Sequence, residues 1–237
     1  GDVVTGYTQD GPPAAFAPVV YTGTGEAQDI VCGLQPDFVW IKSSDNATSH
    51  ALFDSVRGVQ QALVSNATSA EADYSPNYLS SFNPNGFTLG GGGSNANAPG
   101  KNYVAWCWKA GDTTVTNNEG TIASEVRAGS GFSIVSYTGN GVNGASVGHK
   151  LSAEPAMIIV KSRSAQTSNG NWNIWHKEFA QPQQYMTFTN AGVTGSAWNS
   201  TEPTTEVFSL SALEIQNNSG SEYIAYCLSL IHISEPT

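Results

Sequence analysis

Charged residues are scarce in this sequence: they make up 12% of its 237 residues, against about 25% in an average soluble domain. Nine residues are Lys or Arg and 19 are Asp or Glu, so the formal net charge is −10. Because phosphate binding requires Lys and Arg to displace counterions, the sequence argues against a nucleic-acid partner. The acidic balance also disfavours anionic membranes, and no apolar run approaches the roughly 18 residues of a membrane helix.

Cysteine and the common catalytic motifs are sparse as well. The three cysteines, Cys32, Cys107 and Cys227, form no CxxC pair, and an odd number does not make a disulfide framework. Free thiols suit assembly in a reducing cytoplasm. The sequence has no GxSxG, GxxxxGK[ST] or HExxH motif, and no carboxylate pair recurs in both halves. It therefore predicts a protein that is not an enzyme, with no catalytic residues, no metal site and no cofactor.

What the sequence does contain is an internal repeat. Four blocks recur in the same order, each about 120 residues further along the chain. They pair residues 20–25 with 136–141, 36–43 with 155–162, 86–89 with 207–210, and 103–107 with 223–227. Four blocks in order are a much stronger signal than one, so the sequence predicts two degenerate copies of one module.

The apolar segments of each copy are short, rich in β-branched and aromatic residues, and bounded by Gly, Pro, Asn and Ser, as strands are. Residues 55–65 approach helical spacing, although Gly58 weakens it. The predicted fold is all-β, with two tandem β-sandwich modules of jelly-roll character and little helix. Whether each module closes its own core is left open. The predicted boundaries are a leader from an upstream region at 1–17, a first module at 18–110, a linker at 111–130 and a second module at 131–227.

The last ten residues, 228–237, do not continue the repeat. Their sequence, LSLIHISEPT, matches the in-frame translation of a transposase adapter used in short-read library preparation. We interpret this segment as a sequencing artefact of a metagenomic assembly, and expect the natural chain to continue differently beyond Cys227. His232 and Glu235 are therefore not candidate functional residues.

Tryptophans are the best candidates for ligand contacts, because a flat aromatic ring can pack on the apolar face of a sugar. Trp172, Trp175 and Trp198 lie near loops rich in Asn and Ser. We predict that they form an exposed platform, with Asn171 and Asn199 supplying amide hydrogen bonds. The remaining tryptophans lie in apolar strand segments and are predicted to be core: Trp40, Trp106 and Trp108.

Several of these segments resemble repeat-containing tail, fibre and other virion proteins of marine bacteriophages. The segments that carry the resemblance are 37–58 (DFVWIKSSDNATSHALFDSVRG), 83–92 (NPNGFTLGGG), 103–111 (YVAWCWKAG), 131–141 (GFSIVSYTGNG), 155–164 (PAMIIVKSRS) and 198–210 (WNSTEPTTEVFSL). The resemblance implies a repeat-built virion protein with concanavalin-like or SPRY-like β-sandwich regions. That family has no agreed catalytic residues, so none is transferred to this chain.

The predicted function is that of a phage tail or fibre module, a rigid β scaffold whose loops recognise a host-surface glycan. Two alternatives remain: a purely structural virion protein, acting as a spacer or capsid decoration, and a glycan-cleaving enzyme. The expected partners are a host glycan, other virion proteins and further copies of the chain. The expected location is the virion, after assembly in the host cytoplasm.

Overall fold

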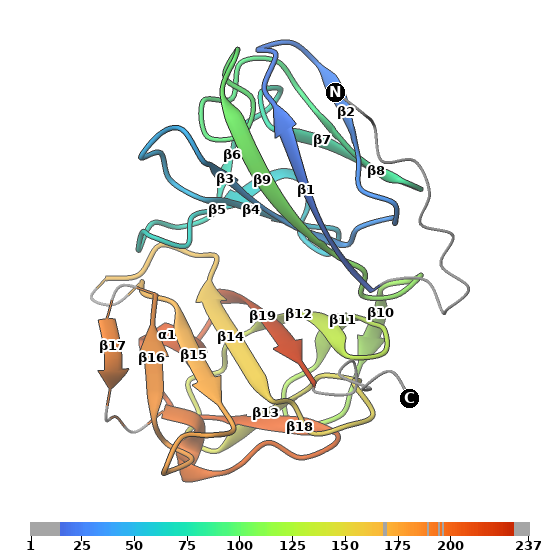
Figure 1. The fold of residues 1–237 in the computed structure, drawn as a ribbon. Coiled ribbons are helices and arrows are strands. Elements are labelled where there is room, and N and C mark those ends of the chain that lie inside the picture. The colour runs from blue at the N-terminus through green and yellow to red at the C-terminus, as the bar shows by residue number, and fades with distance from the viewer. Residues whose placement is uncertain (1–14, 168–169, 189, 194, 196, 230–237) are drawn as a thin grey trace.

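Strands form most of the regular structure in the computed structural model, which describes residues 15–167, 170–188, 190–193, 195 and 197–229. Figure 1 shows two stacked modules, the first coloured blue to green and the second yellow-green to red. Helical structure in the described residues is confined to a short 3₁₀-helix, η1 (Ala197–Ser200), and to α1 (Glu214–Asn217). The predicted all-β fold with β-sandwich character and little helix is confirmed.

The first module is a sandwich of a large and a small antiparallel sheet. The large sheet has the order β1 (Phe16–Thr22), β9 (Asn102–Trp108), β3 (Phe38–Ser43), β4 (Ala51–Asp54), β5 (Gly58–Leu63) and β6 (Ala72–Asp73). The small sheet has the order β2 (Gln28–Val31), β8 (Gly86–Leu89) and β7 (Leu79–Asn83). Ile30 and Phe87 of the small sheet and Ile41 and Tyr103 of the large sheet form one core between them.

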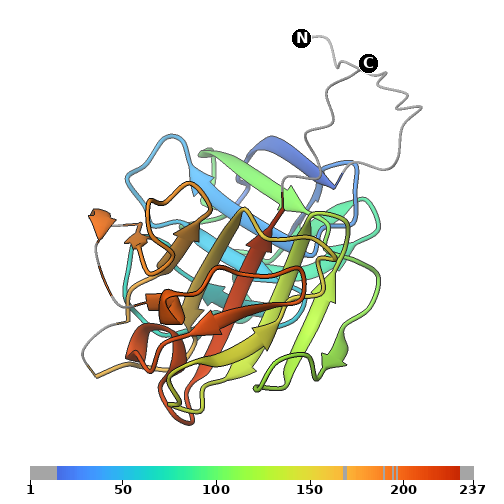
Figure 2. The same ribbon diagram turned by 90° about the horizontal axis from the view of Figure 1, so that it is seen from below.

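The second module repeats this plan with an extended large sheet. Its order is β10 (Val115–Asn117), β11 (Ser124–Ala128), β12 (Phe132–Thr138), β19 (Glu222–Leu228), β14 (Met157–Ser162), β15 (Asn173–His176), β16 (Tyr185–Thr187) and β17 (Asn190–Val193). The small sheet is the pair β13 (Ala145–Gly148) and β18 (Val207–Leu210). Seen from below, this pair crosses in front of the large sheet (Figure 2). A second core fills the space between the two sheets.

The repeat is visible in the side chains as well as in the strand order. Tyr21 of β1 stacks on Tyr103 of β9 with ring centroids 5.3 Å apart and an angle of 15° between the rings. Tyr137 of β12 and Tyr223 of β19 stack with the same distance and angle. The YTG segment of each copy therefore occupies the same place in its module. This equivalence supplies a matched residue in the other copy for many positions.

The predicted boundaries differ from the structure in three places. The segment 111–130, predicted to be a linker, contains β10 and β11, which extend the second large sheet because β11 pairs along β12. Strand β1 begins at Phe16, inside the predicted leader, whose residues 1–14 lie outside the described residues. Leu228, predicted to begin the artefact, ends β19 and pairs with Phe132, whereas 230–237 lie outside the described residues.

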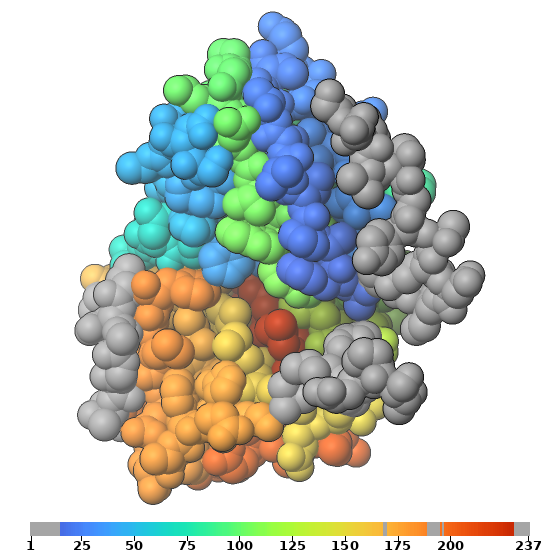
Figure 3. All heavy atoms as spheres, in the orientation of Figure 1, coloured from blue at the N-terminus to red at the C-terminus, as the bar shows by residue number. Residues whose placement is uncertain are grey.

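The two modules pack against each other through the outer faces of their large sheets. The ring of Phe38 in β3 lies 4.4 Å from that of Tyr226 in β19 and 5.9 Å from that of Phe132 in β12. These rings belong to a third apolar cluster, separate from the two module cores. Each module therefore closes its own core, and the two share a further one at the seam between the lobes in Figure 3.

A buried ion network ties the modules together beside this apolar cluster. The guanidinium of Arg57 contacts the carboxylate of Asp54 and lies 2.8 Å from Glu71 Oε2. Arg163, from the second module, binds the same Glu71 carboxylate at 2.9 Å, and the Tyr226 hydroxyl donates to Asp54 at 2.7 Å. A buried charge is tolerated only when it is paired and hydrogen-bonded, so this network favours one relative placement of the modules.

Candidate functional site

The three tryptophans predicted to form an exposed platform are buried. Trp172, Trp175 and Trp198 are 1%, 3% and 1% exposed, so the predicted platform is wrong. The indole N–H of Trp172 donates to the carbonyl of Val64 in the first module at 2.9 Å, which places this ring at the module seam. Because large aromatic side chains bury the most apolar area, they are drawn into cores even beside polar loops.

Trp198 is buried because it replaces part of a strand. The small sheet of the first module has a third strand, β7, whereas the described residues of the second module give its small sheet two strands. At the corresponding place in the repeat the second module has η1, and Trp198 in η1 packs against Phe208 with ring centroids 6.3 Å apart. The indole therefore fills the core space that a third strand would cover.

The two asparagines of the predicted platform are both partly buried. Asn199 is partly buried and follows Trp198 in η1; its Oδ1 accepts a hydrogen bond from Asn143 Nδ2 at 2.9 Å. Its backbone N–H donates to Ser211 Oγ at 2.9 Å, so the residue holds two loops together. Asn171 is partly buried just before β15.

The three tryptophans predicted to be core lie on the outer face of the first large sheet, where Trp40 and Trp108 pack against the apolar cluster shared by the two modules. Trp40, Trp106 and Trp108 are all partly exposed. The register places Trp106 between Trp40 of β3 and Pro18 of β1, so these side chains share one face. The apolar strand segments around these tryptophans predicted burial in a core. They could not reveal that this face points away from the module core.

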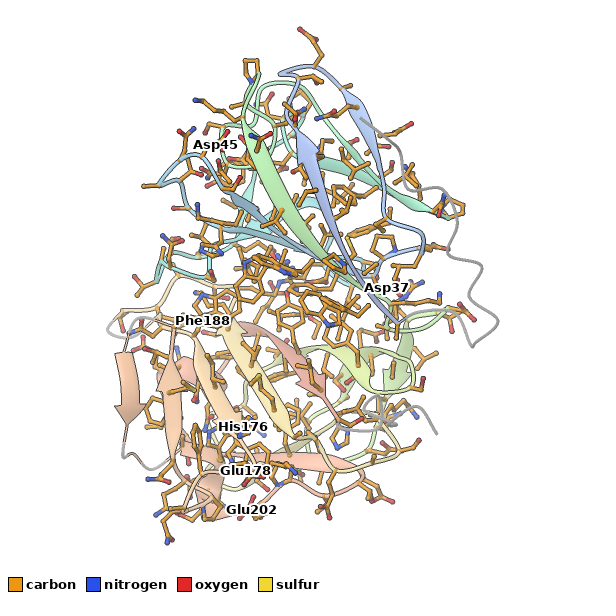
Figure 4. The ribbon with its side chains drawn as sticks, in the orientation of Figure 1. Asp37, Asp45, His176, Glu178, Phe188 and Glu202 are labelled. Atoms are coloured by element: carbon orange, nitrogen blue, oxygen red, sulfur yellow. The ribbon has the colours of Figure 1, made fainter. Side chains whose placement is uncertain are left out.

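A surface pocket of about 680 Å³ lies in the second module, where β14 begins and β15 ends. Its polar side chains are Glu154, Lys177 and Glu202, which are exposed, and Ser229, which is partly buried. Figure 4 labels Glu202 at the lower end of this module, together with His176 and Glu178 on either side of Lys177 in the chain. The remaining lining residues are Pro155, Ala156, Trp175 and Pro203.

Trp175 therefore lines a pocket although its ring is buried. Within the part of the chain that the structure describes, its indole N–H is buried and has no hydrogen-bond partner. An unsatisfied buried donor costs about 1–3 kcal/mol. An unsatisfied donor on a residue that lines a pocket is a position at which a polar ligand would satisfy a hydrogen bond that the protein leaves open.

The first module has no such donor at the equivalent place. In its large sheet Phe53 pairs with Val39, as Trp175 pairs with Ile158 in the second module. Phe53 is fully buried and carries no polar atom. The unpaired indole N–H is thus a property of the second copy. The first copy shows that the same position of the repeat can hold Phe.

The donor set suits a neutral, hydroxyl-rich ligand better than a metal or an anion. Across the described residues, no group of three or more His, Cys, Asp or Glu could hold a metal ion. Glu154 and Glu202 would repel an anion, but they can accept hydrogen bonds from hydroxyl groups. The pocket volume lies within the roughly 300–1,000 Å³ of small-molecule sites.

Within the described residues, no helix is long and apolar enough to cross a membrane.

A second cavity, of about 220 Å³, lies at the module seam. Aromatic and aliphatic side chains line it, among them Trp40, Trp108 and the exposed ring of Phe188, which Figure 4 labels. It is smaller than the roughly 300 Å³ at which small-molecule sites begin, and it has no polar group to orient a ligand. We regard it as imperfect packing between the modules.

The fold and pocket define a two-module β-sandwich protein with a polar pocket beside Trp175 in its second copy. The chain belongs to the family described as a domain of unknown function, DUF7483, whose model matches residues 12–232. The match spans both copies, so the unit of the family is the pair of modules. No curated protein and no solved structure matches the chain.

Proposed function

We propose that this chain is a non-catalytic module of a bacteriophage tail or fibre protein that binds a host-surface glycan in the pocket lined by Trp175. The observation that carries the proposal is that Trp175, whose buried indole N–H has no hydrogen-bond partner among the described residues, lines a pocket with two carboxylates. A saccharide offers oxygen acceptors for the N–H and hydroxyl donors for the carboxylates. The phage context comes from the motif resemblance in the sequence.

The rigid scaffold supports the same proposal. Both modules have complete cores, and the network around Arg57 and Glu71 fixes one against the other. A pocket on such a scaffold is largely preformed, which lowers the entropy cost of binding. The low charge of the chain, 12% of residues, also suits a surface that contacts sugars through neutral groups.

Glycan cleavage is the alternative that the two carboxylates raise. A glycosidase needs one carboxyl group in an environment that keeps it protonated and a second that stays ionised. Glu154 and Glu202 are both exposed to solvent, so the pocket does not give them contrasting environments. Binding without hydrolysis therefore fits the pocket better.

The test is a glycan array of bacterial capsule and lipopolysaccharide oligosaccharides, probed with the wild-type chain and with Trp175→Phe. This change removes the indole N–H and leaves an aromatic ring of the size that Phe53 has at the equivalent, fully buried position of the other copy. Losing one neutral hydrogen bond should weaken binding about 3- to 10-fold. Trp198→Phe is the matched control, because its indole N–H is equally buried and unpartnered but does not line the pocket.

Two outcomes would overturn the proposal. Wild-type protein that binds no oligosaccharide would favour the purely structural alternative. Equal losses in Trp175→Phe and Trp198→Phe would mean that the pocket is not the site. Mass spectrometry of the bound oligosaccharides after incubation adds a third readout, because shortened products would establish the enzyme alternative instead.

A further inference from the structure

The outer face of the first large sheet carries an apolar patch exposed to solvent. Val20 of β1 is 80% exposed and Phe16 is 43% exposed, and Pro18 lies between them on the same face. Val20 pairs with Val104, and Pro18 with Trp106, both partly exposed. The blue and green atoms of β1 and β9 lie along the front of the upper lobe in Figure 3. Contiguous apolar patches of this kind mark interaction surfaces.

This patch continues an interface that already exists within the chain. At one end of the same sheet face, Phe38 and Trp108 pack against Phe132 of the second module, with ring centroids 5.9 and 6.1 Å apart. The equivalent face of the second module is covered there by the first. The outer face of a large sheet can therefore pack against the outer face of another large sheet of the same repeat. The second module covers only one end of the outer face of the first module's large sheet.

The edge of the sheet points to packing on the face and not to strand addition. Among the described residues, strand β1 pairs with β9 alone, whereas its equivalent in the second module, β12, is covered by β11. An open edge strand usually carries a device against pairing, and proline is one of them. Pro18 takes this role in β1, which leaves the apolar face as the surface open to a partner.

We propose that two copies of the chain associate through this patch, formed by Phe16, Pro18, Val20, Val104 and Trp106. Outward positions of β1, β9 and β3 carry no carboxylate, so no pair of like-charged carboxylates on these strands opposes the contact between two chains of net charge −10. A two-fold contact brings the same apolar patch of each copy together, as isologous interfaces require. The proposal is independent of the glycan pocket, which lies in the other module.

Sedimentation velocity on the full chain tests this proposal. Val20→Glu places a carboxylate in the patch, and because Val20 is 80% exposed the fold has no core contact to lose. We expect a wild-type dimer and at least 10-fold weaker association of Val20→Glu. Val31→Glu is the matched control, since Val31 is 64% exposed on β2 of the small sheet and should leave the dimer unchanged.

Three results would overturn the proposal: a wild-type chain that is monomeric at all concentrations, a wild-type trimer, or equal weakening by both substitutions. A monomeric wild type would mean that the patch contacts a protein other than a second copy of this chain. Circular dichroism of each variant confirms that the comparison is made between folded proteins.

Discussion

Replacing Lys161 should change how the stability of the protein depends on pH. Lys161 is fully buried at the module seam, and its ammonium donates to the carbonyls of Ser162 at 3.0 Å and of Thr68, in the first module, at 3.4 Å. Burial lowers the pKa of this lysine from its usual 10.5 to about 8. The cause is loss of hydration, which penalises the charged form.

The direction of the effect follows from proton binding. As pH rises, the folded chain releases this proton near pH 8, whereas the unfolded chain keeps it to about pH 10.5. Between these values the unfolded state binds more protons, so the free energy of unfolding rises with pH. The cost of burying the charge is fully present below pH 8. The two pKa values differ by an amount worth roughly 3 kcal/mol, of which roughly 2–3 kcal/mol appears between pH 7 and pH 10.

Urea unfolding of wild type and Lys161→Met at both pH values measures this contribution. Other groups titrate in the same range, so the quantity of interest is the difference between the two proteins. Wild type should gain roughly 2–3 kcal/mol relative to the variant on going from pH 7 to pH 10. Identical pH dependence in the two proteins would refute the reasoning, because it would mean that Lys161 is not desolvated in the folded chain.

Two further predictions concern other buried groups. Arg57→Met should lower the free energy of unfolding by about 3–5 kcal/mol, because Asp54 would be left as an unpaired buried charge. A loss under about 1 kcal/mol in urea titrations would mean that the buried ion network does not stabilise the packing of the two modules. Cys32 should react with iodoacetamide before Cys227 at neutral pH, since a hydrogen bond with Cys107 lowers the pKa of Cys32 to about 7 while burial raises that of Cys227 to about 12. Peptide mass spectrometry measures the order, and equal labelling would count against it.

Repetition was the most informative property of the sequence. Matching blocks such as 36–43 and 155–162 predicted two related β modules, and these blocks contain β3 and β14. By contrast, the helical spacing of residues 55–65 was misleading. Gly58 has a φ of 99°, a left-handed conformation that interrupts a helix, and the residues form strand β5. Local spacing was less reliable there than the repeat.

The candidate site could be predicted only in part. Trp175 was singled out, and it lines the pocket, but the reason given was exposure and the ring is buried. Glu154 and Glu202 stand 48 positions apart in the sequence, in loops outside the strands, and line one pocket only in the folded chain. Equally, nothing in the strand around Trp106 says which face the second module covers. These features depend on packing between distant segments, which periodicity does not encode.

The central claim is that the indole N–H of Trp175 donates to a saccharide, and proton–nitrogen NMR of the tryptophan indoles tests it most directly. Each of the six tryptophans has one indole N–H, and the signal absent from the spectrum of Trp175→Phe identifies Trp175. Titration with an oligosaccharide selected on the array should shift this signal and leave that of Trp198 in place. A bound oligosaccharide that leaves the Trp175 signal unmoved, or that shifts the signal of Trp106 instead, would contradict the account.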